Sequence, residues 1–365
     1  MSMVIYILIA ILMFGVLIAV HEFGHFITAK LLGFRVNEFA IGMGPKLLHR
    51  QRGETEYTLR ALPIGGFCAM EGEDGDSGDP RAFNNRPVWR QFIVLVAGSF
   101  MNFLTGLLIF VVLFSQTGAY YTTEIAGFLD GFPLQGEEGL MVGDRIVSVD
   151  GHAIYLSSDL DLFFNRAGDT MDLVIERDGE RIVLDDFPMA AREYVVDGET
   201  QVKRGIIRGV NADPTLLDKL ALSWYNTVDT VRLVWVGLGD LVTGAVGLRD
   251  MSGAIGIVTL IGDEAAQAQE QAAATGGNPI AAAAQSIAYI VGFIAINLAV
   301  MNLLPIPALD GGRILFLIVG SIYKLFAKKR LNPKYEGYVN AAGFVCLMAL
   351  MLVVAFSDVL KLFGR

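Results

Sequence analysis

The sequence is poor in charged residues, which make up only 18% of its 365 residues, whereas hydrophobic residues make up 53%. Its mean hydropathy is +0.51. These values exclude an ordinary soluble globular protein and indicate a membrane protein whose surface contacts membrane lipids. Basic residues are also scarce, 28 against 38 acidic ones, and the net charge is −10. We therefore expect no nucleic-acid partner.

Cysteine is nearly absent. Cys68 and Cys346 lie far apart, the second within an apolar run, so no disulfide framework is indicated. The N-terminal apolar run is preceded by no Lys or Arg and followed by no small-residue cleavage site. It is therefore predicted to be a retained membrane span and not a signal peptide.

Long hydrophobic runs are the main positive feature. Four segments are long and apolar enough to cross a membrane, and the third continues past a break: about 3–25, 92–114, 287–304 and 340–357. A further apolar stretch at 230–248 contains Arg232 and Asp240. We expect it to form an amphipathic helix on the outer membrane surface, because a fifth span would place the basic loop 324–334 outside.

The basic residues predict the orientation. Loops 30–90 and 324–334 together hold 14 of the 28 Lys and Arg residues, so both should be cytoplasmic. Residues 115–285 hold 11 basic and 26 acidic residues and belong on the outer, periplasmic face of a bacterial inner (plasma) membrane. Both termini should also lie outside.

The outer region begins with the pattern of a small α+β domain. A strand is bounded by Gly143-Asp144 and Asp150-Gly151, a helix capped by Ser157 or Ser158 runs to Arg166, and two strands meet at Asp178-Gly179. This pattern resembles a PDZ domain. A second hairpin is predicted at Asp197-Gly198, and the Ala/Gln-rich stretch 263–286 suggests a mobile linker or a loose helix.

These observations predict a multi-span α-helical membrane protein with four transmembrane helices, a membrane re-entrant β-loop and an inserted α+β PDZ domain. The expected divisions are the first two spans at 1–114, the PDZ domain at 115–192, an outer hairpin, amphipathic helix and linker at 193–286, and the last two spans at 287–365.

The first span ends in the sequence His21-Glu22-Phe23-Gly24-His25. Histidines four residues apart share one face of a helix and can bind one metal ion, and Glu22 can take a proton from water beside that metal. This is the HExxH pattern of zinc peptidases. Three ionisable groups at the end of a membrane-length segment are costly unless they function or face a wet cavity. The alternative is that both histidines merely cap a helix near the headgroups.

A second polar group follows the third long span, in the run 302–312, NLLPIPALDGG. Pro305 and Pro307 cannot both lie in an ordinary helix, so the chain is predicted to be extended where Asp310 appears. Span lengths place Asp310 and His21 at a similar depth, near the cytoplasmic side. Asp310 is the expected third metal ligand, and the alternative is a helix cap in an Asp-Gly-Gly turn.

Residues 57–67, YTLRALPIGGF, have β-like character followed by a Pro/Gly turn and are too short to cross the membrane. Non-helical backbone at membrane depth is tolerated only against protein or a water-filled cavity. We therefore expect this segment to dip toward the metal and to pair with an unwound substrate by β-addition.

The combination of these motifs resembles the site-2 protease family, specifically the bacterial regulator-of-sigma-E type of zinc intramembrane protease. The resemblance implies Zn²⁺ bound by His21, His25 and Asp310, with Glu22 as catalytic base. The resemblance also implies that Asn302 positions the substrate. The other predicted substrate-binding residues are Tyr57, Leu59, Gly65, Gly66, Pro305 and Pro307. Two motifs depart from the family pattern, at Gly98-Ser99-Phe100-Met101-Asn102 and at Ser252-Gly253-Ala254.

The resemblance also implies the substrate, a single-span protein such as an anti-sigma factor or a signal-peptide remnant. An upstream site-1-type protease would act indirectly by making a first cut on the outer face, as in regulated intramembrane proteolysis. The alternatives are a membrane metal or proton transporter, which also places His, Glu and Asp inside a helix bundle, and a catalytically idle PDZ scaffold. Neither alternative requires both a Glu beside the His pair and an extended strand.

Overall fold

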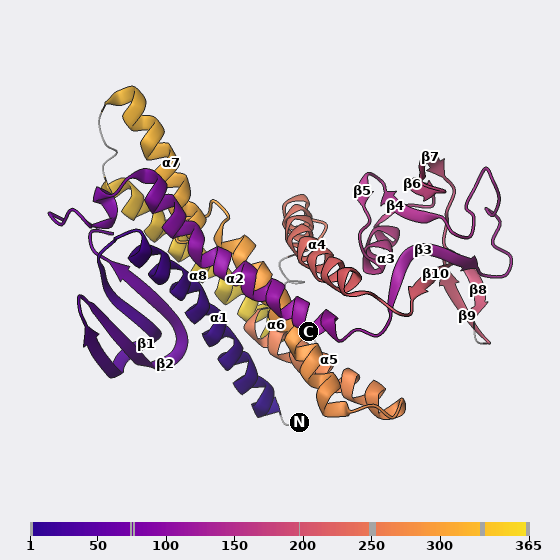
Figure 1. The fold of residues 1–365 in the computed structure, drawn as a ribbon, viewed down its shortest axis with the longest axis horizontal. Helices are drawn as coiled ribbons and strands as arrows, with labels where there is room; N and C mark the ends of the chain where they lie inside the picture. The colour runs from indigo at the N-terminus through magenta and orange to yellow at the C-terminus, as the bar shows by residue number, and fades with distance from the viewer. Residues whose placement is uncertain are drawn as a thin grey trace. The chain divides into compact units, whose positions relative to one another are not determined.

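The computed structural model describes residues 3–73, 75, 77–196, 198–247, 253–328 and 333–362. The chain divides into two compact units (Figure 1). One comprises Met1–Phe110 together with Thr230–Arg365, and the other is Val111–Asp229. The predicted turn residue Asp197 and the motif residue Ser252 lie outside the described residues.

Four helices in the described part of the chain are long and apolar enough to cross a membrane, at Ile5–Leu31, Val88–Ser115, Pro279–Asn302 and Gly337–Lys361. They belong to α1 (Met3–Leu31), α2 (Val88–Ser115), α6 (Pro279–Asn302) and α8 (Pro333–Leu362). The prediction of four spans is therefore confirmed. The third begins earlier than predicted because the Asn278 side chain caps it, accepting hydrogen bonds from the backbone N–H groups of Ile280 and Ala281.

Of the two alternatives predicted for 263–286, a mobile linker or a loose helix, the structure shows a largely helical segment. Helix α5 (Ala254–Ala274) buries Ile261 and Ala265 in a core shared with α1 and α6. Members of this core include Tyr6, Met13, Leu17, Ala283 and Ile290. The loop predicted at 324–334 begins within another helix, α7 (Asp310–Ala327), and its residues 329–332 lie outside the described ones.

Helix α4 (Leu216–Thr243) contains most of the predicted amphipathic stretch and starts fourteen residues before 230. It is not one of the four described helices that are long and apolar enough to cross a membrane. Large apolar side chains on it are exposed, among them Leu217, Leu220, Trp224 and Trp235, whereas the polar side chains of Ser223, Thr227 and Thr230 are buried. An inverted distribution of this kind is typical of a helix whose apolar face meets lipid.

A curled sheet lies beside α1 and is built from β1 (Val36–Arg52) and β2 (Thr55–Met70) (Figure 1). Residues 36–41 pair with 66–70 and, on their other side, with 56–59, while 46–52 pair with 55–60. Leu59, for example, has both Ile41 and Leu48 as partners. This differs from the prediction that the 57–67 segment offers a free edge, because the unpredicted β1 occupies both sides of residues 57–59.

The second unit is an α+β domain whose main sheet has the order β10-β3-β4-β6-β7, with β5 paired to β4. Its strands are β3 (Tyr120–Phe128), β4 (Arg145–Val149), β5 (His152–Ala153), β6 (Met171–Arg177), β7 (Glu180–Phe187) and β10 (Ile206–Asn211). The predicted hairpin is present, with Asp178 and Gly179 at positive φ. The sheet takes β10 from beyond residue 192, where we expected the domain to end.

Helix α3 (Ser157–Arg166) begins where predicted, but neither Ser157 nor Ser158 caps it. The Asp159 carboxylate instead accepts hydrogen bonds from the backbone N–H groups of Tyr155 and Leu156. The second predicted hairpin is formed by β8 (Arg192–Val196) and β9 (Glu199–Lys203).

Candidate metal centre

The two histidines of the HExxH motif lie on one face of α1 and are buried, with 8% of His21 and 7% of His25 exposed. The helix forms because residues 3–20 are a continuous apolar run without Pro, and it continues through the motif to Leu31. The spacing of four residues brings the rings together, with centroids 4.7 Å apart.

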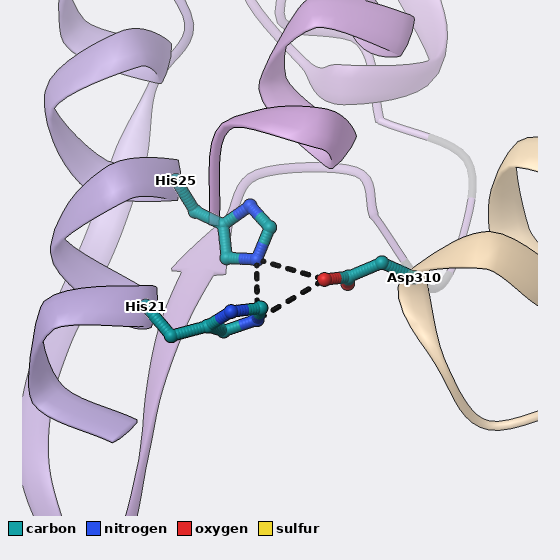
Figure 2. Close-up of side chains that lie close together, drawn as sticks. All are labelled: His21, His25 and Asp310. Atoms are coloured by element: carbon teal, nitrogen blue, oxygen red, sulfur yellow. Dashed lines mark hydrogen bonds and ion pairs between the residues drawn. The ribbon is translucent and has the colours of Figure 1, made fainter. Parts of the chain in front are cut away.

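Asp310, the first residue of α7, points at both rings (Figure 2). Its Oδ2 lies 3.1 Å from His21 Nε2 and 3.3 Å from His25 Nε2, and the two Nε2 atoms are 3.1 Å apart. Ligands at about 2.0–2.1 Å in a tetrahedral zinc site are roughly 3.3 Å from one another. Asp310 Oδ2 is buried and has no hydrogen-bond donor of acceptable geometry in the described part of the chain. The three side chains therefore fit Zn²⁺, and three ligands leave the fourth position open for catalysis.

Backbone and amide groups orient the two rings. The Nδ1–H of His25 donates to the carbonyl oxygen of Val94 on α2 at 2.8 Å, which leaves the Nε2 lone pair for a metal. The Asn302 side chain, at the end of α6, lies 3.5 Å from His21 Nδ1. When His21 Nε2 binds a metal, Nδ1 carries a proton, so the Asn302 amide must turn its oxygen toward that ring.

Gly98 of α2 gives the histidines their space. A Cβ atom at this position would overlap His25 Nε2 and come within 2.7 Å of His21 Cε1. The segment 98–102, which departs from the family pattern, therefore has a residue without a side chain at the position closest to the two rings.

We expect Gly98→Ala to lower zinc affinity by at least about 10-fold, the range observed when the support of a metal ligand is lost. The measurement is a zinc titration of the purified protein against a competing chelator. Gly237→Ala is the matched control, because a Cβ there meets nothing within 4 Å. Equal affinities in the two variants would contradict this account of Gly98.

Two glycines after Asp310 allow the ligand loop to fold back tightly. A Cβ on Gly311 would overlap the carbonyl oxygens of Leu303 and Leu304, and one on Gly312 would overlap that of Ile306. Pro305 and Pro307 lie in the irregular segment between α6 and α7, as predicted. Ala308 adopts φ +74°, a strained conformation for a residue with a Cβ, and its N–H donates to Asn340 Oδ1 of α8 at 3.4 Å.

The sheet approaches the metal centre at Glu22. A Cβ on Gly66 would lie 3.4 Å from Glu22 Cγ and 2.9 Å from the Ala40 carbonyl oxygen. Segment 66–70 therefore lies beside the expected base, and it pairs with residues 36–41 on one side.

Two other predicted substrate residues, Tyr57 and Gly65, make contacts with residues other than the metal ligands. Tyr57 packs on Phe26 and Phe39, with ring centroids 5.8 and 6.4 Å away, and Gly65 at φ +89° lies against Met43.

The sequence reasoning missed the carbonyl of Val94. No sequence signal identifies it, because any residue supplies a carbonyl.

Comparisons with known proteins agree with this geometry. The model of peptidase family M50 matches residues 9–350. A relative from Clostridium perfringens whose name describes a zinc metalloprotease is 36% identical over 97% of this chain and 98% of its own length. The regulator of sigma-W protease RasP of Bacillus subtilis is 28% identical over 97% of this chain and 98% of its own length.

Proposed function

The chain belongs to peptidase family M50 and is a zinc metalloprotease, and from that premise we propose that it cleaves the transmembrane segments of single-span proteins. The observation that carries the proposal is the convergence of His21, His25 and Asp310 beside Glu22 within a helix that is long and apolar enough to span a membrane. Ionisable groups are expensive at that depth, so a complete ligand set with an adjacent base is best explained by hydrolysis there.

Zinc, when bound, acts as a Lewis acid and makes water nucleophilic near neutral pH. Glu22 accepts the proton of the attacking water and passes it to the departing amine. Gly66 of β2 lies beside the Glu22 side chain. Asn302, next to His21, donates from its amide to the scissile carbonyl and stabilises the charge that develops on the carbonyl oxygen.

The substrate must be extended, because a helix hides its carbonyl groups in hydrogen bonds to residue i+4. Segment 66–70 is better placed than 57–59 to pair with it, since 57–59 has partners on both sides. Gly65 precedes this edge and Gly66 begins it, and the irregular loop with Pro305 and Pro307 adjoins the third ligand. A substrate between these two segments would present its backbone to both by β-addition.

The surroundings support a membrane setting. Apolar side chains of the curled sheet are exposed, including Met43, Leu47, Leu48 and Leu62, as expected for a re-entrant sheet in contact with lipid. The distribution of basic residues supports an inner-membrane orientation with both termini and the PDZ-like domain on the periplasmic side. The substrate would then arrive after a first outer cut by another protease.

The test is cleavage of reconstituted single-span substrates by the purified protein in lipid. We expect cleavage within the span, complete inhibition by a chelator, and recovery on addition of Zn²⁺, because the metal supplies the Lewis acid. The fragments are identified by mass spectrometry. Uptake of zinc into vesicles without any cleavage would support the transporter alternative, and zinc binding without either activity would support a scaffold.

A further inference from the structure

The Glu73 carboxylate connects two parts of the membrane unit that carry catalytic groups. Its Oε2 accepts a hydrogen bond from the backbone N–H of Met70, the last residue of β2, at 3.1 Å. Its Oε1 forms an ion pair with Arg313 Nη1 in the first turn of α7. The side chains are 13% and 30% exposed, so solvent screens this pair less than a fully exposed one.

Both partners of Glu73 lie close in sequence to a catalytic group or to a residue beside one. Met70 is four residues beyond Gly66, where an added Cβ would lie 3.4 Å from Glu22 Cγ. Arg313 is three residues beyond Asp310 and therefore nearly one helical turn along the same face. A shift of α7 along the sheet would change the distance between the base and the third ligand.

Apolar packing alone leaves such a shift possible. Ile314 and Leu317 of α7 pack against a core that contains Cys68, Met70 and Val94. Dispersion contacts of this kind are not directional, whereas a charge-assisted hydrogen bond fixes the position of one group against another. The ion pair between Glu73 and Arg313, at the rim of this core, can therefore fix the position of α7 along the sheet.

We propose that Glu73 and Arg313 are positioning residues that hold Glu22 and Asp310 at the separation catalysis requires. The inference rests on the proposed function, since a separation matters only if both groups act on one peptide bond. The pair acts through β2 and α7, because Glu73 accepts a hydrogen bond from Met70 N–H and Arg313 belongs to α7.

The test is a double-mutant cycle with Glu73→Gln, Arg313→Gln and the double variant. Gln at position 73 keeps the acceptor for Met70 and removes only the charge. We expect each single variant to lower kcat about 10-fold, with KM and zinc content unchanged, because small displacements of catalytic groups cost roughly this much or more. The double variant should also lose about 10-fold and not 100-fold, since the two changes break one interaction.

Arg313→Lys should restore part of the rate, and Glu54→Gln is the matched control. Glu54 pairs with Lys30 and Arg81, and none of these residues belongs to α7. Unchanged kcat in the single variants, a 100-fold loss in the double variant, or loss of zinc in proportion to activity would each overturn the proposal. Absence of chelator-sensitive cleavage by the wild-type protein would instead refute the proposed function.

Discussion

Replacing Glu22 with Gln is expected to abolish peptide cleavage while leaving zinc bound. The amide keeps the shape of the carboxylate but cannot take a proton from water. Loss of general-base catalysis lowers kcat by about 10²–10⁴-fold. The measurement pairs single-turnover cleavage of a reconstituted span with metal analysis of the same sample.

Glu264→Gln makes the same chemical change on the exposed surface of α5 and should retain wild-type activity. If Glu22→Gln lost zinc and activity together, Glu22 would be a ligand and not the base. If it retained activity, another group would supply the base, and the proposed mechanism would fail.

The local parts of the metal centre were predictable from the sequence because they depend on helix periodicity. His21 and His25 meet on one face of α1 as a spacing of four residues requires. Asp310 was predicted from the Pro-x-Pro interruption before it, and the structure places its carboxylate against both rings. Asp310 is also the first residue of α7, but Leu309 is the N-cap residue and no side chain caps the helix, so the alternative that Asp310 is a helix cap is wrong.

The sheet beside α1 was predicted only in part, because strand pairing is a long-range property. Residues 36–52 contain Gly42, Gly44 and Pro45 and alternate poorly between apolar and polar positions, so their pattern does not indicate a strand. Gly42 and Gly44 both have φ +85° and let β1 bend around β2. Without β1, the occupied edges of Leu59 could not be foreseen.

Helix α5 shows a different limit. Its buried positions are Ile261 and Ala265, and residues 265–274 are mostly Ala and Gln, so small side chains hide the periodicity. The same composition fits a linker. The helix packs against α1 and α6. The sequence alone does not show that these three helices meet.

Replacing Asp310 with Ala is expected to lower zinc affinity by at least about 100-fold, more than the 10–100-fold that loss of a ligand's hydrogen-bond partner costs. The variant keeps both histidines on α1 but removes the only carboxylate within 4.8 Å of them that could act as third ligand among the described residues. Two neutral imidazoles would then face the Zn²⁺ charge without an anionic ligand, and the site would lose both geometry and electrostatic attraction. The measurement is competitive titration with a chelator, followed by cleavage assays at saturating zinc.

Saturating zinc separates the role of Asp310 in binding from a role in folding. If Asp310 is a ligand, excess zinc should restore part of the occupancy in Asp310→Ala but little of the activity, because the metal would be held by two side chains in the wrong geometry. Asp263→Ala, on the exposed surface of α5, should match the wild-type protein in both assays. Full zinc occupancy of Asp310→Ala at wild-type affinity would show that the third ligand lies elsewhere. Since Asp310 Oδ2 is buried beside both Nε2 atoms, that result would also require another explanation for a carboxylate placed there.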